Sequence, residues 1–139
     1  MAESNNWQAL EGKKVLLCED HPINGEIVSS LLEKQGVTVI LAENGKEGVQ
    51  AFAGSQCGEF SAVIMDVNMP LMDGFEAARA IRALNRPDAP SVPIVAMSAD
   101  DTAECKNKAL SAGMTARFPK PVDARKLYDL LSELISPQG

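Results

Sequence analysis

The fold of this chain is decided by the stretch Val15-Leu16-Leu17-Cys18-Glu19-Asp20-His21-Pro22, in which an apolar run ends in two carboxylates and a proline. Four consecutive apolar residues have the length of a strand that is buried on both faces, rather than that of a helix. From Pro22 a helical pattern begins, and Gly36 supplies its C-terminal stop. The expected apolar face of this helix comprises Ile23, Ile27, Val28, Leu31 and Leu32.

The same alternation of a short apolar run with a helical pattern continues along the chain. An edge strand is expected over 37–41, buried strands over 62–65 and 92–97, and a weak strand over 115–118. Asn44 is placed to cap a short helix, and further helices are expected around 75–81, over 101–113 and over 127–134. The helix over 101–113 has a capping-box pattern at Asp101 and Glu104 and a thin apolar face. Five strands alternating with five helices predict an α/β fold with a doubly wound parallel sheet.

The length and composition restrict what this chain can be. Its 139 residues leave room for one domain, expected over 13–135, with short tails over 1–12 and 136–139. A net charge of −6 disfavours nucleic-acid binding by this domain. No apolar run approaches a membrane span and the first residues do not resemble a signal peptide, so a cytoplasmic protein is expected. Three widely spaced cysteines suggest neither a disulfide framework nor a zinc site.

Polar and charged side chains follow four of the five predicted strands. Glu19 and Asp20 end the first, Asp66 the third, Ser98 the fourth and Lys120 the fifth. Because the carboxyl ends of parallel strands meet at one edge of a sheet, we expect these groups to converge. Three gathered carboxylates need a cation, and Mg²⁺ is the hard divalent ion that such oxygens hold together with phosphate. A carboxylate nucleophile, a metal and a lysine are the parts that phosphoryl transfer needs.

On four motifs the sequence resembles the receiver domain of two-component response regulators, and the resemblance covers about residues 13–135. The motifs are Leu-Leu-Cys-Glu-Asp (16–20), Val-Ile-Met-Asp-Val-Asn-Met-Pro-Leu-Met-Asp-Gly (63–74), Ala-Met-Ser-Ala (96–99) and Lys-Pro (120–121). The stretches 19–24 and 98–101 look most like receivers fused to hybrid sensor histidine kinases. The fold that the resemblance implies is flavodoxin-like, with strand order 2-1-3-4-5 and five helices.

The resemblance also implies a role for each site residue. Asp66 is expected to accept a phosphoryl group from a phosphohistidine donor, with Lys120 paired to that group and Ser98 swinging towards it. The expected Mg²⁺ ligands are Asp20 and Asp66, the backbone carbonyl of Asn68, and Glu19 acting through water. Lys120 and Pro121 are expected to be joined by a cis peptide bond.

Four positions near the site depart from the family pattern or tune it. An aromatic residue often stands three positions before the lysine, but here Arg117 holds that position with Phe118 beside it, which weakens the case for aromatic–hydroxyl coupling. Ser98 replaces the commoner threonine and so loses a methyl group that helps to fix the rotamer. Asn68 and Asp100 occupy positions that in the family tune how long the phosphoryl group survives.

The resulting hypothesis is a regulated phosphoacceptor switch in a phosphorelay. Phosphorylation of Asp66 is expected to pull Ser98 and the helix over 101–113, changing the surface formed by that helix, the fifth strand and the last helix. The chain is not expected to be a turnover enzyme by itself, although it is expected to catalyse its own aspartyl phosphorylation and dephosphorylation. It is expected to be either a stand-alone regulator or a fragment of a larger protein, such as a hybrid histidine kinase tethered to a membrane sensor. The expected partners are a histidine kinase or a histidine phosphotransfer domain, with weak homodimerisation on phosphorylation and no membrane contact by this domain.

Three alternatives remain open from the residues alone. A Mg²⁺-dependent phosphohydrolase of the haloacid dehalogenase type also uses an aspartate nucleophile, but it normally has Asp-x-Asp where this chain has Asp66 followed by Asn68. A flavodoxin-type electron carrier shares the fold, although two carboxylates after the first strand would repel a flavin phosphate. A receiver that acts only as a non-phosphorylated docking module is the third.

Overall fold

The computed structural model describes residues 7–67, 69, 72–99, 102–120 and 122–135. Its strands form one parallel sheet in the order β2-β1-β3-β4-β5. The strands are β1 Lys14–Cys18, β2 Thr38–Ala42, β3 Ala62–Asp66, β4 Ile94–Ser98 and β5 Ala116–Pro119. The helices are α1 Pro22–Glu33, α2 Gly45–Ala53, α3 Gly74–Arg82, α4 Ala103–Ser111 and α5 Ala124–Ile135, preceded by a 3-10 turn, η1, over Trp7–Leu10. The predicted α/β class, doubly wound sheet and strand order are confirmed.

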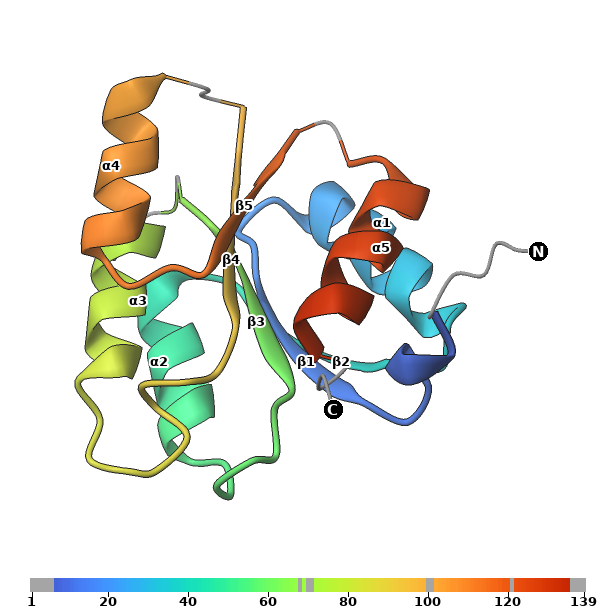
Figure 1. Cartoon of the computed structure of the whole chain (residues 1–139), viewed down its shortest axis with the longest axis horizontal. Helices are drawn as coiled ribbons and strands as arrows, with labels where there is room; N and C mark the ends of the chain where they lie inside the picture. Colours follow the sequence, from blue (N-terminus) through green and yellow to red (C-terminus); the bar gives the residue numbers. More distant parts are fainter. Residues whose placement is uncertain (1–6, 68, 70–71, 100–101, 121, 136–139) are drawn as a thin grey trace.

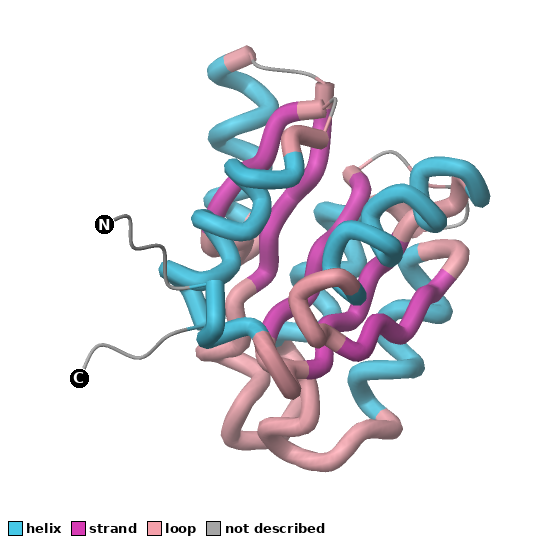
Figure 2. Tube along the Cα trace, turned by 90° about the vertical axis from the view of Figure 1, so that its right-hand side faces the viewer, coloured by secondary structure: helices cyan, strands magenta, loops and turns pink. Residues whose placement is uncertain are grey.

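The sheet separates two hydrophobic cores. Helices α1 and α5 cover one face, and α2, α3 and α4 cover the other (Figure 1). Seen at right angles, the strands lie between the two helical layers (Figure 2). All five residues of β3 are buried, whereas β2, at the edge, is mostly exposed, as the alternating pattern over 37–41 predicted. No helix in the described part of the chain is long and apolar enough to cross a membrane.

Helix α1 turns a different face to the sheet from the one predicted. Val28 and Leu32 are buried as expected, but Ile23 is 61% exposed and Ile27 is 48% exposed. The helix approaches β2 through Gly25, where an added Cβ would lie 3.3 Å from the side chain of Leu41. Hydrophobic periodicity could not predict this contact, because glycine has no side chain. With Gly25 facing β2, Ile23 and Ile27 point outward.

Helix α4 begins one residue later than its predicted capping box. Its N-cap is Thr102, whose side chain accepts a hydrogen bond from the backbone N–H of Cys105, so the assignment of the cap to Asp101 was wrong. Asp101 itself lies outside the described residues. The thin apolar face is confirmed, since the buried residues of α4 are Cys105 and Ala109.

Residues before Lys13 are not all loose. Leu10 is fully buried, and Trp7 packs edge-on against Tyr128 of α5 with ring centroids 4.9 Å apart. The Trp7 indole donates a 2.7 Å hydrogen bond to Asp129, and the Tyr128 hydroxyl donates one of 2.7 Å to the carbonyl of Leu31 in α1. The turn therefore packs on α5, and Tyr128 ties α5 to α1. The domain limits of 13 and 135 stay a prediction.

A glycine on α2 makes room for a cysteine on β1. A Cβ at Gly48 would collide with Sγ of Cys18, which is fully buried in the core under α2. Cys18 is the last residue of β1 and directly precedes Glu19, so the fit between this thiol and this glycine sets how closely α2 lies against the end of the strand.

We expect Gly48→Ala to lower the free energy of unfolding by about 1–3 kcal/mol, because the new methyl overpacks against Cys18. Urea denaturation should show that Cys18→Ala recovers most of this loss when the two are combined, as a double-mutant cycle requires of residues in contact. Gly54→Ala is the control, because its Cβ would meet nothing closer than 3.4 Å. Additive effects of the two substitutions would contradict this account.

Candidate functional site

Strand register brings the predicted carboxylates together. In the parallel pairing of β1 with β3, Cys18 lies beside Met65, so the residues that follow them, Glu19 and Asp66, meet at the same edge of the sheet. The pairing of β3 with β4 places Asp66 beside Met97, directly before Ser98, and Ser98 is paired with Pro119, directly before Lys120. The convergence expected from the sequence is thus built by three adjacent strand pairs.

One lysine faces two buried carboxylates. Lys120 Nζ lies 3.1 Å from Oδ2 of Asp66 and 3.8 Å from Oε1 of Glu19. The Asp66 side chain is 4% exposed and that of Glu19 is 1% exposed, while Lys120 reaches in from a position with 24% exposure. Burying charged groups costs desolvation free energy, which an ion pair offsets only when its geometry is good. The 3.1 Å distance between Lys120 and Asp66 is such a geometry.

The pKa of Glu19 is raised from its ordinary value of 4.5 to about 7, mainly by burial, and the neighbouring Asp66 carboxylate acts in the same direction. The backbone N–H of His21, which donates a 3.1 Å hydrogen bond to Oε2, and the charge of Lys120 act in the opposite direction. Oε1 of Glu19 accepts no hydrogen bond from any described residue. The site therefore holds more carboxylate than its lysine can neutralise.

The surplus of carboxylate has the composition of a site for a hard cation. One oxygen from each of Glu19, Asp20 and Asp66 lies within 4.8 Å of the others. Glu19 and Asp66 are buried and Asp20 is exposed, so the cluster opens to solvent on the side of Asp20. All-oxygen ligands from carboxylates suit Mg²⁺, and Oε1 of Glu19, which accepts no hydrogen bond from the described residues and has Lys120 only at 3.8 Å, is a buried oxygen that a cation could satisfy.

Ser98 ends β4 beneath the site. It is 1% exposed, and its carbonyl accepts a 3.1 Å hydrogen bond from the backbone N–H of Lys120, which ties β4 to the lysine. Its hydroxyl lies 3.9 Å from Sγ of Cys105 in the first turn of α4. No sequence motif pointed to this cysteine.

The loop that follows β3 returns close to Asp66. The backbone N–H of Gly74 donates a 3.1 Å hydrogen bond to the carbonyl of Val67. A Cβ at Gly74 would lie 2.5 Å from the Asp66 carbonyl oxygen and 2.7 Å from Cα of Val67, so only glycine allows this approach. Asp73 then caps α3 in a capping box with Glu76, which the sequence analysis did not identify.

The remaining predicted residues lie elsewhere or outside the described residues. Asn68, Asp100 and Pro121 belong to the latter group, so the proposed carbonyl ligand, tuning residue and cis peptide bond stay predictions. Phe118 is 4% exposed and packs in the core with α5. Arg117 lines a cavity of about 220 Å³ between α4 and β5 together with Leu110, which is 71% exposed.

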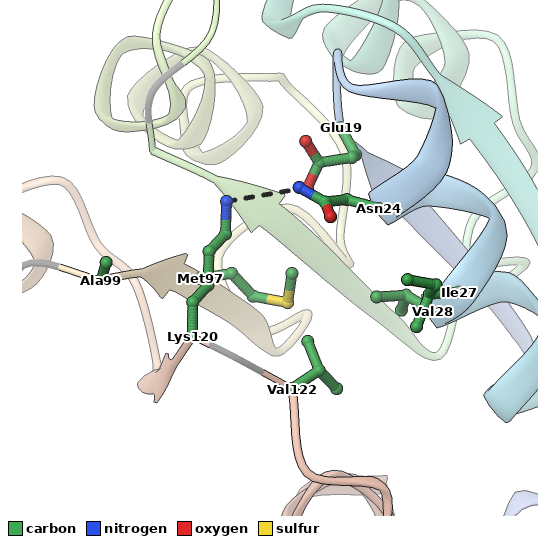
Figure 3. Close-up of a pocket in the computed structure, with 8 residues that line it drawn as sticks. All are labelled: Glu19, Asn24, Ile27, Val28, Met97, Ala99, Lys120 and Val122. Carbon is green, nitrogen blue, oxygen red and sulfur yellow. Dashed lines mark ion pairs between the residues drawn. The ribbon is translucent and has the colours of Figure 1, made fainter.

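An apolar groove of about 410 Å³ opens beside the carboxylates. Figure 3 shows Lys120 extended towards Glu19 at one end, with Ile27, Val28 and Val122 around the other. The groove lies between the first turns of α1 and the segment after β5. Its lining comprises Glu19, Asn24, Ile27, Val28, Met97, Ala99, Lys120 and Val122. The outward face of α1, predicted to be core, thus borders the site.

The fold and site together define a doubly wound α/β protein with an acidic site at the carboxyl edge of its sheet. The sequence pattern of the response regulator receiver domain matches residues 15–132, and the chain belongs to this family. It is therefore a receiver domain of the two-component type, as the four motifs predicted.

Two curated relatives illustrate the sequence similarity. The chain is 40% identical over 119 residues to the sensor protein GacS of Pseudomonas syringae pv. syringae, which is 85% of this chain and 13% of that protein. It is 30% identical over 125 residues to hybrid signal transduction histidine kinase I of Dictyostelium discoideum, which is 88% of this chain and 7% of that protein. The chain thus spans a small part of the length of these relatives.

Two solved structures illustrate the structural similarity. The receiver domain of a sensor histidine kinase from Pseudomonas aeruginosa, described with a magnesium ion coordinated in its active-site cleft, has a TM-score of 0.82 and 30% identity, covering 91% of this chain and 99% of that one. The receiver domain of a response regulator from Saccharomyces cerevisiae, solved with a histidine phosphotransfer protein, has a TM-score of 0.77 and 30% identity, covering 88% of each chain.

The raised pKa of Glu19 predicts how stability depends on pH without metal. Between 4.5 and about 7 the folded chain holds a proton on Glu19 that the unfolded chain has lost, so stability is full below this window and falls as pH rises through it. In a chelator, Glu19→Gln should gain about 1–3 kcal/mol on the wild type between pH 5 and pH 8. Urea denaturation measures this, with the exposed Glu133→Gln as control. Parallel profiles for wild type and Glu19→Gln would contradict it.

Proposed function

We propose that this receiver domain accepts a phosphoryl group on Asp66. The observation that carries the proposal is the 3.1 Å pair between Asp66 Oδ2 and Lys120 Nζ, inside a cluster of three carboxylates. A buried carboxylate whose charge is held by one lysine is an available nucleophile, and the same lysine is placed to neutralise charge on an incoming phosphoryl group.

The transfer itself is simple in its bonds. An Asp66 oxygen attacks the phosphorus of a phosphohistidine, the P–N bond breaks, and the imidazole nitrogen keeps the electron pair and takes a proton from water. The product is an aspartyl phosphate, which water later hydrolyses to the carboxylate and inorganic phosphate. Lys120, now 3.1 Å from the Asp66 carboxylate, would stay near the new phosphoryl oxygens because its ammonium group is a mobile point charge.

The residues that would hold Mg²⁺ are Asp20 and Asp66, with Glu19 acting through water. Bound there, Mg²⁺ would offset the negative charge of the carboxylates and the phosphoryl group. The buried Oε1 of Glu19, which accepts no hydrogen bond from the described residues, and the oxygen-only donor set fit this ion. The carbonyl of Asn68 is proposed as a further ligand.

The proposed output is a change in the surface that α4 forms with β5 and α5. The buried Ser98 hydroxyl lies 3.9 Å from Cys105 in the first turn of α4, and α4 has two buried residues with which to resist displacement. If Ser98 turns towards a phosphoryl group on Asp66, the start of α4 loses a neighbour and the surface that it forms with β5 and α5 changes. Weak self-association on phosphorylation is proposed for the same surface.

The proposed donor is a histidine kinase or a histidine phosphotransfer domain that docks over the apolar groove. The groove ends at Lys120, so a partner helix lying across Ile27 and Val122 would bring its phosphohistidine to Asp66. The outward-facing Ile23 and Ile27 extend the apolar surface along α1. Membership in the receiver family argues against the two alternative functions, a haloacid-dehalogenase-type phosphohydrolase and a flavodoxin-type electron carrier. Phosphorylation of Asp66 would distinguish a phosphoacceptor from a non-phosphorylated docking module.

Intact-protein mass after incubation with a small acyl-phosphate donor tests the phosphoacceptor directly. The wild type should gain one phosphoryl group in the presence of Mg²⁺ and none in a chelator, because the carboxylates would otherwise repel the donor. Asp66→Asn should gain none. Asp123→Asn is the matched control, since asparagine can also cap the start of α5. Equal labelling of Asp66→Asn and wild type would refute the assignment, and no labelling of any protein would favour the docking module.

Substitutions in the groove should separate docking from chemistry. Val122→Asp and Ile27→Asp are expected to slow transfer from a phosphorylated histidine phosphotransfer domain by about tenfold or more, because docking would bury an unpaired charge. Labelling by the small donor should not change. Leu110→Asp, on exposed α4 away from the groove, is the control. The docking proposal fails if the two groove variants accept phosphoryl groups from the protein donor as fast as the control, and charged substitutions at Asn24 give an independent third position.

A further inference from the structure

The first turn of α4 places a thiol beside the hydroxyl of Ser98. Cys105 Sγ is oriented as a donor to Ser98 Oγ at 3.9 Å, which is a weak S–H···O contact. Both groups are buried, Cys105 being 6% exposed and Ser98 1% exposed. The contact joins the end of β4 to α4 directly, seven residues apart along the chain.

A hydrogen bond to the backbone of Cys105 helps to fix the position of its thiol. The side chain of Thr102 accepts a 3.2 Å hydrogen bond from the N–H of Cys105, so the helix cap and the Ser98 contact converge on one residue. Cys105 and Ala109 are the residues that α4 buries within the described chain. A movement of Ser98 therefore acts on one of the two side chains that seat this helix.

We propose that Cys105 is a positioning residue for Ser98. Its thiol holds the hydroxyl in the resting orientation, and it transmits the turning of Ser98 to the first turn of α4. The proposal rests on the proposed function, in which Ser98 turns towards a phosphoryl group on Asp66. Because the contact exists in the resting state, it opposes that turn, and its removal should favour the switched state.

Beryllofluoride, which mimics a phosphoryl group on an aspartate, provides the test when titrated with Mg²⁺ and followed by the amide signals of Ser98 and α4. Cys105→Ala should lower the half-saturating concentration about twofold to threefold, the amount that a weak contact can contribute. Cys105→Ser keeps a donor and should lie closer to the wild type. Ala109→Gly is the matched control, because it weakens α4 without touching Ser98.

The possible outcomes distinguish coupling between Cys105 and Ser98 from a general loss of stability in α4. A half-saturating concentration in Cys105→Ala that equals the wild type would overturn the proposal, as would an equal shift in Ala109→Gly. Should Cys105→Ala not fold, maleimide labelling of the wild type decides: beryllofluoride should accelerate labelling of Cys105 while the exposed Cys57 serves as internal reference, and an unchanged rate overturns the proposal. A wild type that binds no beryllofluoride contradicts the proposed function itself.

Discussion

Glu19 and Asp66 are nearly fully buried carboxylates that share one ammonium group, that of Lys120. One positive charge does not fully compensate two buried negative charges, and the consequence is the raised pKa of Glu19 and an Oε1 that accepts no hydrogen bond from the described residues. The third carboxylate, Asp20, adds to the imbalance from the solvent side. A bound cation would offset this excess of negative charge and stabilise the site.

The carboxylates are held close together by buried strands in fixed register. Adjacent strands β1, β3 and β4 are buried along their whole described lengths apart from Lys14, and their register fixes Glu19, Asp66 and Ser98 at neighbouring positions. Lys120 follows β5, the edge strand beyond them, and is tied to β4 by its backbone. The site thus combines fixed carboxylates with a lysine and a helix, α4, that are held by fewer contacts.

The sequence predicted the sheet and the convergence of the carboxylates because both follow from regular geometry. A buried apolar run and the residue after it suffice to place Glu19 and Asp66, whatever the helices do. Predictions were wrong where a local contact that the hydrophobic pattern does not encode sets the position of a helix. On α1, periodicity counted Ile23 and Ile27 as core, whereas the missing side chain of Gly25 lets the helix rest on Leu41 and turns both isoleucines outward. On α4, two acceptors one residue apart competed for the cap, and the structure uses Thr102.

Because α4 buries few residues, small contacts near Ser98 contribute a large share of the interactions that hold its first turn. A helix cap such as that of Thr102 contributes about 1 kcal/mol, and α4 buries Cys105 and Ala109 rather than a stripe of large side chains. Leu110, its one large aliphatic residue, is 71% exposed. With so little apolar burial to hold the helix, a loss of the Ser98–Cys105 contact is a sizeable fraction of what keeps the first turn in place. By contrast α5, seated by Leu127, Tyr128 and Leu131 and tied to α1 and η1, would not respond to a change of that size.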